Sequence, residues 1–332
     1  MPTHDDVALA DDDVESLLLE KVKVLNQLLW EGQATRPAVD QWLQNFDGTY
    51  TSSRTERLHA LYLLSKFLYF GRAEIRELLK AMFRDLVRQP LTAQAREALA
   101  DRSNFKRVHQ AFLQELNATR FLGLGNPSES AAYILYNFRT TNRLPIEFFP
   151  NFYELFSKAL NSSDNEWVDT GVRRIIFIDD FCGTGGQAVD LSAKYLPVIS
   201  QAALNSGVSV ETWYLTILGT SSGLDRVRAN TDFSYVDSVS ELDDSYRSFG
   251  PGAQIFSSPP TGVTGSEAEG IATHYGGKLA PAHPLGYENS QLLVGFHHNV
   301  PDNSLPIFWF DEPEPLWSPI FPRVSKLSMI GA

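Results

Sequence analysis

The sequence predicts an α/β protein with a mainly parallel, doubly wound sheet, preceded by a helical N-terminal part. Residues 13–120 carry apolar side chains at helical spacing, whereas short apolar strand candidates alternate with helical stretches from residue 121 onward. Such an alternation is typical of a parallel sheet that helices cover. We therefore expect a helical part over residues 1–118 and an α/β domain over residues 119–332.

Length, charge and cysteine content narrow the class of protein further. The chain has 332 residues, which is more than one core usually holds, and a net charge of −12. Residues 121–332 contain 12 basic and 23 acidic side chains, which argues against broad binding to a phosphate backbone there. We expect no membrane span, because no apolar run reaches about 18 residues. A single cysteine, Cys182, fits a reducing, cytoplasmic setting.

Two features of the helical part carry predictions. Ser53 and Glu56 have the spacing of a capping box, and the helix from residue 72 is expected to stop at Pro90. That helix also carries a basic side chain at every fourth position, and these form a ridge: Arg72, Arg76, Lys80, Arg84 and Arg88. The ridge is either a solvated face or a docking strip for an acidic partner, which would be a nucleic acid or a protein.

The α/β part has a recognisable order of elements. The expected strands and helices are a strand at 121–125, a helix at 131–138, a strand at 173–178, a helix at 185–204 and a strand at 208–218. Residues 219–290 are richer in Gly, Ser and Pro, and a last strand candidate lies at 291–298. The proline-rich tail that follows carries aromatic side chains, which we expect to pack on the core.

The stretch "IIFIDDFCGTGGQ", residues 175–187, concentrates the chemistry. Three glycines let the backbone curl at the start of a helix, where N–H groups and the helix dipole favour a phosphate. Asp179 and Asp180 suit sugar hydroxyls, or a Mg²⁺ ion that binds together with the ligand. A sugar phosphate with free hydroxyls satisfies both halves, and we expect both carboxylates to face solvent in the empty site. Cys182 is expected to pack under the turn, since no base lies near it in the sequence.

The same stretch resembles the phosphoribosyl-diphosphate loop of type I phosphoribosyltransferases: four apolar residues, two acids, two apolar residues and a small-Thr-Gly-x-Thr turn. The resemblance implies that Asp179 and Asp180 meet the ribose 2′- and 3′-hydroxyls, and that the turn holds the 5′-phosphate. The implied ligand-binding set is Asp179, Asp180, Phe181, Cys182, Gly183, Thr184, Gly185, Gly186 and Gln187. Two positions depart from the family pattern. Gln187 stands where the family has Thr or Ser, and Gly183 stands where some members carry an acidic general base.

Other segments extend the resemblance. In type I enzymes a strand, loop and helix before the sugar-phosphate strand bind diphosphate, and "FLGLGNPSESAAY" occupies that place, with Asn126, Ser128 and Ser130 as possible contacts. The segments "ALYLLSKFLYF", "GYENSQLLVGFHHNVPDNSLPIFW" and "WSPIFPR" resemble phosphoribosyltransferase-like domains of bacterial conflict and antiphage systems, including retron-associated effectors. That similarity covers most of residues 51–325. It implies an effector or sensor that binds phosphoribosyl diphosphate or a nucleotide.

Two other functions stay open. "IDDFCGTGG" also resembles the cofactor loop of S-adenosylmethionine-dependent methyltransferases, and "SSPPTG" at 257–262 is similar to their Pro-Pro motif. Against this reading, the next strand does not end in an acid, and Thr261 stands where an aromatic residue normally stacks on the target base. The third reading is a non-catalytic nucleotide-binding module on the same fold. The sequence leaves open whether the protein transfers or hydrolyses at the ribose C1′ carbon.

Overall fold

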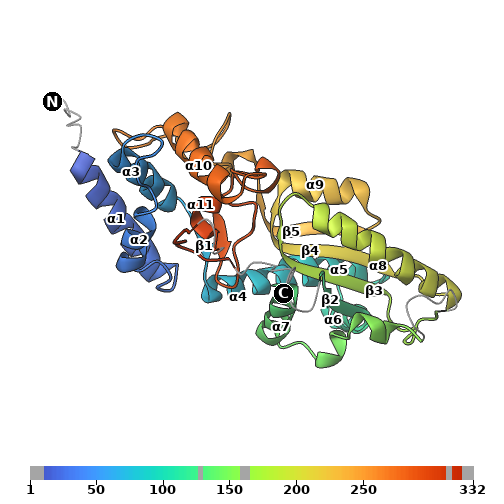
Figure 1. The fold of residues 1–332 in the computed structure, drawn as a ribbon. Coiled ribbons are helices and arrows are strands. Elements are labelled where there is room, and N and C mark those ends of the chain that lie inside the picture. The colour runs from blue at the N-terminus through green and yellow to red at the C-terminus, as the bar shows by residue number, and fades with distance from the viewer. Residues whose placement is uncertain (1–10, 126–129, 158–164, 312–315, 324–332) are drawn as a thin grey trace. The chain divides into compact units, whose positions relative to one another are not determined.

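The computed structural model describes residues 11–125, 130–157, 165–311 and 316–323 (Figure 1). The chain divides into two compact units, one formed by residues 1–72 together with 243–332, the other by residues 73–242. The predicted α/β class is confirmed, with parallel sheets and helices at the N-terminus. The division differs from the boundary expected between residues 118 and 119, because the helices after residue 72 pack with the larger sheet. In the described ranges, no helix is both long enough and apolar enough to cross a membrane.

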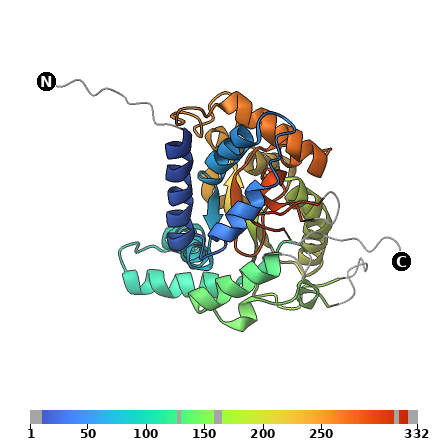
Figure 2. The same ribbon diagram turned by 60° about the vertical axis from the view of Figure 1, so that its left-hand side comes forward.

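The unit built from both ends of the chain is mostly helical. Its longer elements are α1 Asp11–Leu28, α2 Arg36–Leu43, α3 Ser53–Leu64, β1 Leu68–Phe70, α10 Gly265–Leu279, β6 Val294–Phe296 and α11 Pro306–Trp309, with the short 3-10 turns η4 Asp244–Tyr246 and η5 Tyr287–Asn289. Helix α3 packs against both α1 and α10, and α1 lies beside α3 in Figures 1 and 2. The last strand candidate is β6, which pairs in parallel with β1 and not with the larger sheet.

Aromatic side chains fill the core of this unit. The Trp42 ring stacks on Phe308 with centroids 5.3 Å apart, and its indole N–H donates to the Ile307 carbonyl oxygen at 2.7 Å. Trp317, from the proline-rich tail, is only 8% exposed and its indole N–H donates to the same oxygen. The expectation that the tail aromatics pack on the core is therefore confirmed for these residues.

Glu56 does not complete a capping box. The N-cap of α3 is Ser52, not Ser53, and its hydroxyl accepts the backbone N–H of Thr55. The Glu56 carboxylate is fully buried and accepts three backbone N–H groups of the 48–51 loop and the Tyr275 hydroxyl. Burial acts to raise the pKa of Glu56, but these hydrogen bonds outweigh it and leave that pKa below its usual value. The carboxylate thus fastens the loop to α3 and α10.

The unit of residues 73–242 contains the larger sheet. Its elements are α4 Arg72–Ala81, η1 Met82–Arg88, α5 Gln89–Glu97, α6 Phe105–Asn117, β2 Thr119–Gly123, α7 Ser130–Asn142, η2 Ile146–Phe148, η3 Phe152–Leu155, β3 Arg174–Cys182, α8 Gly186–Asn205, β4 Glu211–Thr220, α9 Ser221–Asn230 and β5 Tyr235–Leu242. The four strands are all parallel, in the order β2-β3-β4-β5. Regular elements therefore extend into residues 219–290, which the sequence predicts to be looser.

Helices cover both faces of this sheet (Figure 1). On one face, Phe177 of β3 and Tyr214 of β4 are neighbours in register and pack with Leu196 of α8 and with α9. On the other face, Phe121 of β2 contacts Phe138 of α7, with centroids 5.2 Å apart, and η1 packs on β4 and β5. This two-sided covering matches the predicted doubly wound arrangement.

The helix that starts at Arg72 does not stop at Pro90. Its middle, η1, is a π-helix, and the N–H of Gln89 donates to Arg84 five residues earlier before α5 continues the helix. A proline inside an α-helix loses its bond to residue i−4 and clashes with that carbonyl. The π segment shifts the bonding by one residue, which lets Pro90 enter the first turn of α5, where no N–H is needed.

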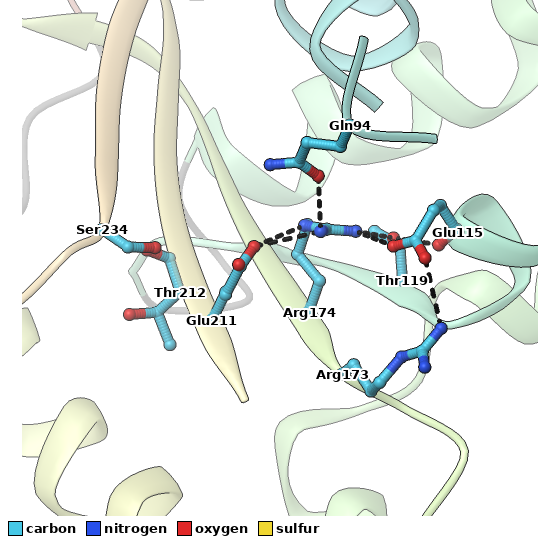
Figure 3. Close-up of polar contacts among 8 residues, drawn as sticks. All are labelled: Gln94, Glu115, Thr119, Arg173, Arg174, Glu211, Thr212 and Ser234. Atoms are coloured by element: carbon cyan, nitrogen blue, oxygen red, sulfur yellow. Dashed lines mark hydrogen bonds and ion pairs between the residues drawn. The ribbon is translucent and has the colours of Figure 1, made fainter. Parts of the chain in front are cut away.

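Arg174, the first residue of β3, anchors this strand at the amino end of the sheet (Figure 3). Its guanidinium donates to Glu211 at 3.0 Å, to Gln94 at 2.9 Å and to Glu115 at 3.3 Å. It also lies 4.9 Å from the centre of the Trp213 ring, and its side chain is 4% exposed. These contacts join β3 to α5, α6 and β4, and thereby help to fix the position of the strand and of its carboxyl end.

Candidate functional site

The two acids lie inside β3, not after it. The sequence predicts a strand over residues 173–178, but β3 continues to Cys182 because it is paired with β4 as far as Gly219. Asp179 stands opposite Thr216 of β4, and on the other side Ile178 stands opposite Gly123 of β2. The acids are thus held by a central strand near the carboxyl edge of the sheet, where ligands bind in folds of this class.

Both carboxyl groups are buried, so the expectation that they face solvent is wrong. Asp179 and Asp180 are each 8% exposed. The Asp179 carboxylate accepts the Tyr214 hydroxyl at 3.2 Å and the backbone N–H of Asp180 at 2.9 Å. The carboxyl groups are buried because β3 extends past them, which keeps both acids within the sheet.

Burial and proximity make the pair costly to ionise. Burial, and then the neighbouring charge of Asp180, raise the pKa of Asp179 well above its usual value. Two buried carboxylates that interact in this way cannot both be charged cheaply without a cation or hydrogen-bond donors to compensate them. The pair is therefore suited to a ligand that supplies hydroxyl donors or carries a divalent cation.

Cys182 packs beneath the turn, as the sequence predicts. Its thiol is buried, and burial together with the charge of Asp179 raises the pKa of Cys182 to about 12. Tyr214, which also hydrogen-bonds Cys182, has a raised pKa for the same main reason, burial. A neutral thiol under a turn is a packing group and not a nucleophile. Phe181, between the acids and the thiol, is half-buried.

The turn from Gly183 to Gln187 is fixed by the start of α9. Gly185 has φ 74°, and a Cβ there would lie 2.5 Å from the carbonyl oxygen of Gly223 in α9. The Thr220 hydroxyl donates to the carbonyl oxygen of Gly183 and accepts the N–H of Gly223 at 2.9 Å. Gly185 is thus required by its positive φ and by the approach of α9.

The remaining turn residues border more open space. A Cβ on Gly186, the first residue of α8, would lie no closer than 3.7 Å to any neighbour, the nearest being the Thr184 hydroxyl. Thr184 is half-buried, whereas Gln187 is exposed. The open side of the turn is therefore at Gly186, at the positive end of the α8 dipole.

Arg226 of α9 is a candidate residue that the sequence did not reveal. Its guanidinium donates to the carbonyl oxygen of Thr184 at 3.3 Å and lies 3.9 Å from the position of a Cβ on Gly186. A cation beside the open side of the turn suits a phosphate. Only the order of the strands could have pointed to Arg226. Because α9 follows the strand next to β3, its first turns must lie beside the β3–α8 turn.

The loop after β2 lies only partly within the described residues. Asn126 and Ser128 lie outside the described residues, whereas Ser130 begins α7 and is half-buried. Gly123 pairs with Ile178, so the loop leaves the sheet beside Asp179. A Cβ on Gly123 would lie 3.2 Å from that of Ala131, which shows how closely α7 approaches the strand end.

The donor set fits a cation that a ligand brings with it. Within the described ranges, no group of three or more His, Cys, Asp or Glu side chains is placed to hold a metal ion. Two adjacent carboxyl groups match the way Mg²⁺ is bound next to phosphates, since that ion keeps water and substrate oxygens as its other ligands.

The comparisons with known proteins identify one family. The family model described as PRTase-CE matches residues 39–323, which includes parts of both compact units. No curated protein matches the chain. Among solved structures, the chain is similar to the AQ2163 protein from Aquifex aeolicus, with 9% identity over 63% of this chain and 86% of that chain, at a TM-score of 0.27.

Proposed function

Because the chain belongs to the PRTase-CE family and carries a phosphoribosyltransferase-like domain, we propose that the carboxyl edge of its sheet binds phosphoribosyl diphosphate or a nucleotide together with Mg²⁺. The observation that carries the proposal is the buried carboxyl pair Asp179 and Asp180 beside the N-terminus of α8. A ribose phosphate complements both, since its hydroxyls donate to the acids and its phosphate meets the helix start.

Each part of the site has a role in this proposal. The acids receive the ribose hydroxyls or the Mg²⁺ that accompanies the ligand. The turn from Gly183 to Gln187 receives the 5′-phosphate, with Arg226 as a second source of positive charge. Mg²⁺ would supply charge neutralisation for a diphosphate group. Gln187 replaces a hydroxyl donor by an amide, which also donates hydrogen bonds to phosphate oxygens.

The enzymatic form of the proposal is transfer or hydrolysis at the ribose C1′ carbon. Positioning of the sugar and stabilisation of the departing diphosphate would carry such a reaction, because its transition state builds charge at the leaving group. Gly183 offers no general base at its position. The other form is a sensor that binds the nucleotide without chemistry, in the setting of a bacterial defence system that the sequence resemblance implies.

Calorimetry with phosphoribosyl diphosphate, with and without Mg²⁺, tests ligand binding. We expect Asp179→Asn/Asp180→Asn to abolish binding and to keep the fold, because asparagine has nearly the same shape as a protonated aspartic acid. Asp190→Asn on the exposed side of α8 removes a nearby charge and should leave affinity unchanged. Unchanged affinity in the folded double variant would refute the proposal, and tight binding of S-adenosylmethionine by the wild type would favour the methyltransferase reading.

Two further assays separate the forms of the proposal. Incubation with radiolabelled phosphoribosyl diphosphate and a panel of nucleobases shows turnover if the protein is an enzyme, and none if it is a sensor. Plaque counts on bacteria that carry the system with wild-type protein or with Asp179→Asn/Asp180→Asn test the defence role. Equal protection by both proteins would exclude a role for this site in defence.

A further inference from the structure

The exposed face of α6 presents rings and cations side by side. Phe105 is 77% exposed, and His109, one helical turn later on the same face, is also exposed. The His109 ring packs on Phe112 with centroids 6.2 Å apart, and the Arg88 guanidinium lies 5.8 Å from the centre of that same Phe112 ring. Arg88 of η1 therefore adjoins this face of α6. Lys106, which is exposed, lies three residues before His109 and so borders the same face.

We call Arg88, Phe105, Lys106 and His109 the aromatic–basic strip. The strip shares only Arg88 with the basic ridge that the sequence predicts. Acidic neighbours neutralise two other members of that ridge. Lys80 pairs with Glu77 and Arg84 pairs with Asp85, each at 2.6 Å. Past Met82 the π-helical bonding also turns the row of basic residues away from the line that α-helical spacing would give. At its Arg88 end, the ridge adjoins α6 through the Phe112 ring.

The local charge is opposite to that of the chain. Residues 72–107 hold nine Lys or Arg and five Asp or Glu, whereas the whole chain has a net charge of −12. Cations gathered on one helical layer of an acidic protein attract a polyanion to that layer only. The overall negative charge disfavours binding elsewhere, so a bound polyanion would be confined to this surface.

The ring on Phe105 decides which polyanion fits. A phenylalanine that is 77% exposed contributes little to the core, and its flanking side chains are Asn104, the helix N-cap, and the cation Lys106. An acidic peptide would use the cations and leave the ring face without a partner. In a duplex the base faces are stacked on one another and closed to a protein ring. Unpaired bases stack on exposed rings while their phosphates meet nearby cations.

We propose that the aromatic–basic strip binds single-stranded nucleic acid, with bases stacked on Phe105 and His109 and phosphates held by Arg88 and Lys106. This site is separate from the proposed sugar-phosphate site and does not depend on it. The bound strand would lie along α6, so its recognition is by stacking and charge and not by sequence.

Fluorescence anisotropy of the full chain with labelled single strands of about 16 nucleotides, the upper range of such sites, tests the proposal. Oligo-dT, oligo-U and a duplex of the same length are titrated between about 50 and 200 mM salt. We expect both single strands to bind more tightly than the duplex. Phe105→Ala should weaken binding by about 5- to 150-fold at every salt concentration, because stacking is not screened.

The charged residues have a different signature. Arg88→Gln/Lys106→Gln should lower the slope of log affinity against log salt by about 1.4, since each phosphate contact to a single strand contributes about 0.7. The matched control, Lys23→Gln/Lys194→Gln, removes the same charge from exposed positions on α1 and α8 and should retain the wild-type affinity. All four positions are exposed, so thermal stability should stay unchanged and any loss can be assigned to binding.

Four outcomes would overturn the proposal. They are absence of binding to either single strand at the lowest salt, no effect of Phe105→Ala, an equal loss in the control pair, and displacement of the strand by poly-glutamate as efficiently as by unlabelled oligonucleotide. The last outcome would assign the surface to an acidic protein. Tighter binding of both single strands than of the duplex supports the proposal, and any preference between oligo-dT and oligo-U then identifies the kind of strand.

Discussion

Arg174→Met should destabilise the unit of residues 73–242 far more than Arg173→Met, although the two arginines are neighbours. The Arg174 side chain is 4% exposed and reaches Glu211, Gln94 and Glu115, whereas the Arg173 side chain is 57% exposed and donates to Glu115 at 3.2 Å. The pair therefore compares a buried, multiply bonded guanidinium with an exposed one at nearly the same place.

The contacts set the magnitude. A hydrogen bond to a charged group contributes about 1.5–3 kcal/mol, and removing one partner of a buried pair costs about 3–5 kcal/mol. Glu211 and Glu115 are 46% and 27% exposed, so water can solvate them after the substitution and the cost falls toward the lower end. Loss of the contact between the guanidinium and the Trp213 ring adds roughly 0.5–1 kcal/mol. We expect roughly 3–5 kcal/mol for Arg174→Met and roughly 0–1 kcal/mol for Arg173→Met.

Urea unfolding followed by circular dichroism measures both variants against the wild type. In thermal melts, roughly 2–4 °C per kcal/mol for a unit of this size gives a drop of roughly 6–20 °C for Arg174→Met. Arg174→Lys keeps the charge but loses the planar fork, so it should recover only part of the stability. Similar destabilisation by the two methionine variants, or a loss under about 1 kcal/mol for Arg174→Met, would refute the reasoning.

Three other outcomes follow from the structure. Gly223→Ala should lower thermal stability sharply, because its Cβ would meet the Gly183 carbonyl oxygen. The control Gly277→Ala in α10, where a Cβ would meet open space, should raise stability by about 0.5–1 kcal/mol. Equal effects of the two substitutions would contradict the close approach of Gly223 to Gly183. The folded-state pKa of Glu56 is depressed, so its stabilisation is present above its ordinary pKa of 4.5 and is lost as pH falls through the folded value. Glu56→Gln should thus be less stable at neutral pH and lose less between pH 5 and 3 in acid titrations followed by fluorescence, whereas parallel curves would argue against it. The Cys182 thiol should resist iodoacetamide in the native protein and react on unfolding, as mass spectrometry would show, while rapid native labelling would contradict its raised pKa.

The sequence predicts the centre of the larger sheet well. The run "IIFI" at residues 175–178 is apolar on both faces, as a strand buried between two helical layers must be, and it forms the first half of β3. The glycine-rich turn and α8 follow where the sequence places them. These are local features, since burial and turn chemistry are written in neighbouring residues.

Features that depend on distant partners could not be predicted in this way. Strand β5 mixes polar and apolar residues without a regular alternation and lies at the edge of the sheet, so "YVDSVSEL" resembles a loop in composition. The burial of Asp179 depends on how far β3 pairs with β4, and Arg226 reaches the turn only because two strands are adjacent. The division of the chain at residue 72 also depends on pairing, since β1 finds its partner in β6.

That pairing has a consequence for synthesis on the ribosome. Residues 73–242 are contiguous, so every strand of the larger sheet has emerged once Leu242 has cleared the exit tunnel. The first helices cannot complete their packing at that stage, because α3 packs against α10 and Trp42 packs against Phe308, and both partners are translated later. The amino-terminal helices must therefore remain exposed while the inserted unit is made, and this interval is when the nascent chain is most open to chaperones and to aggregation.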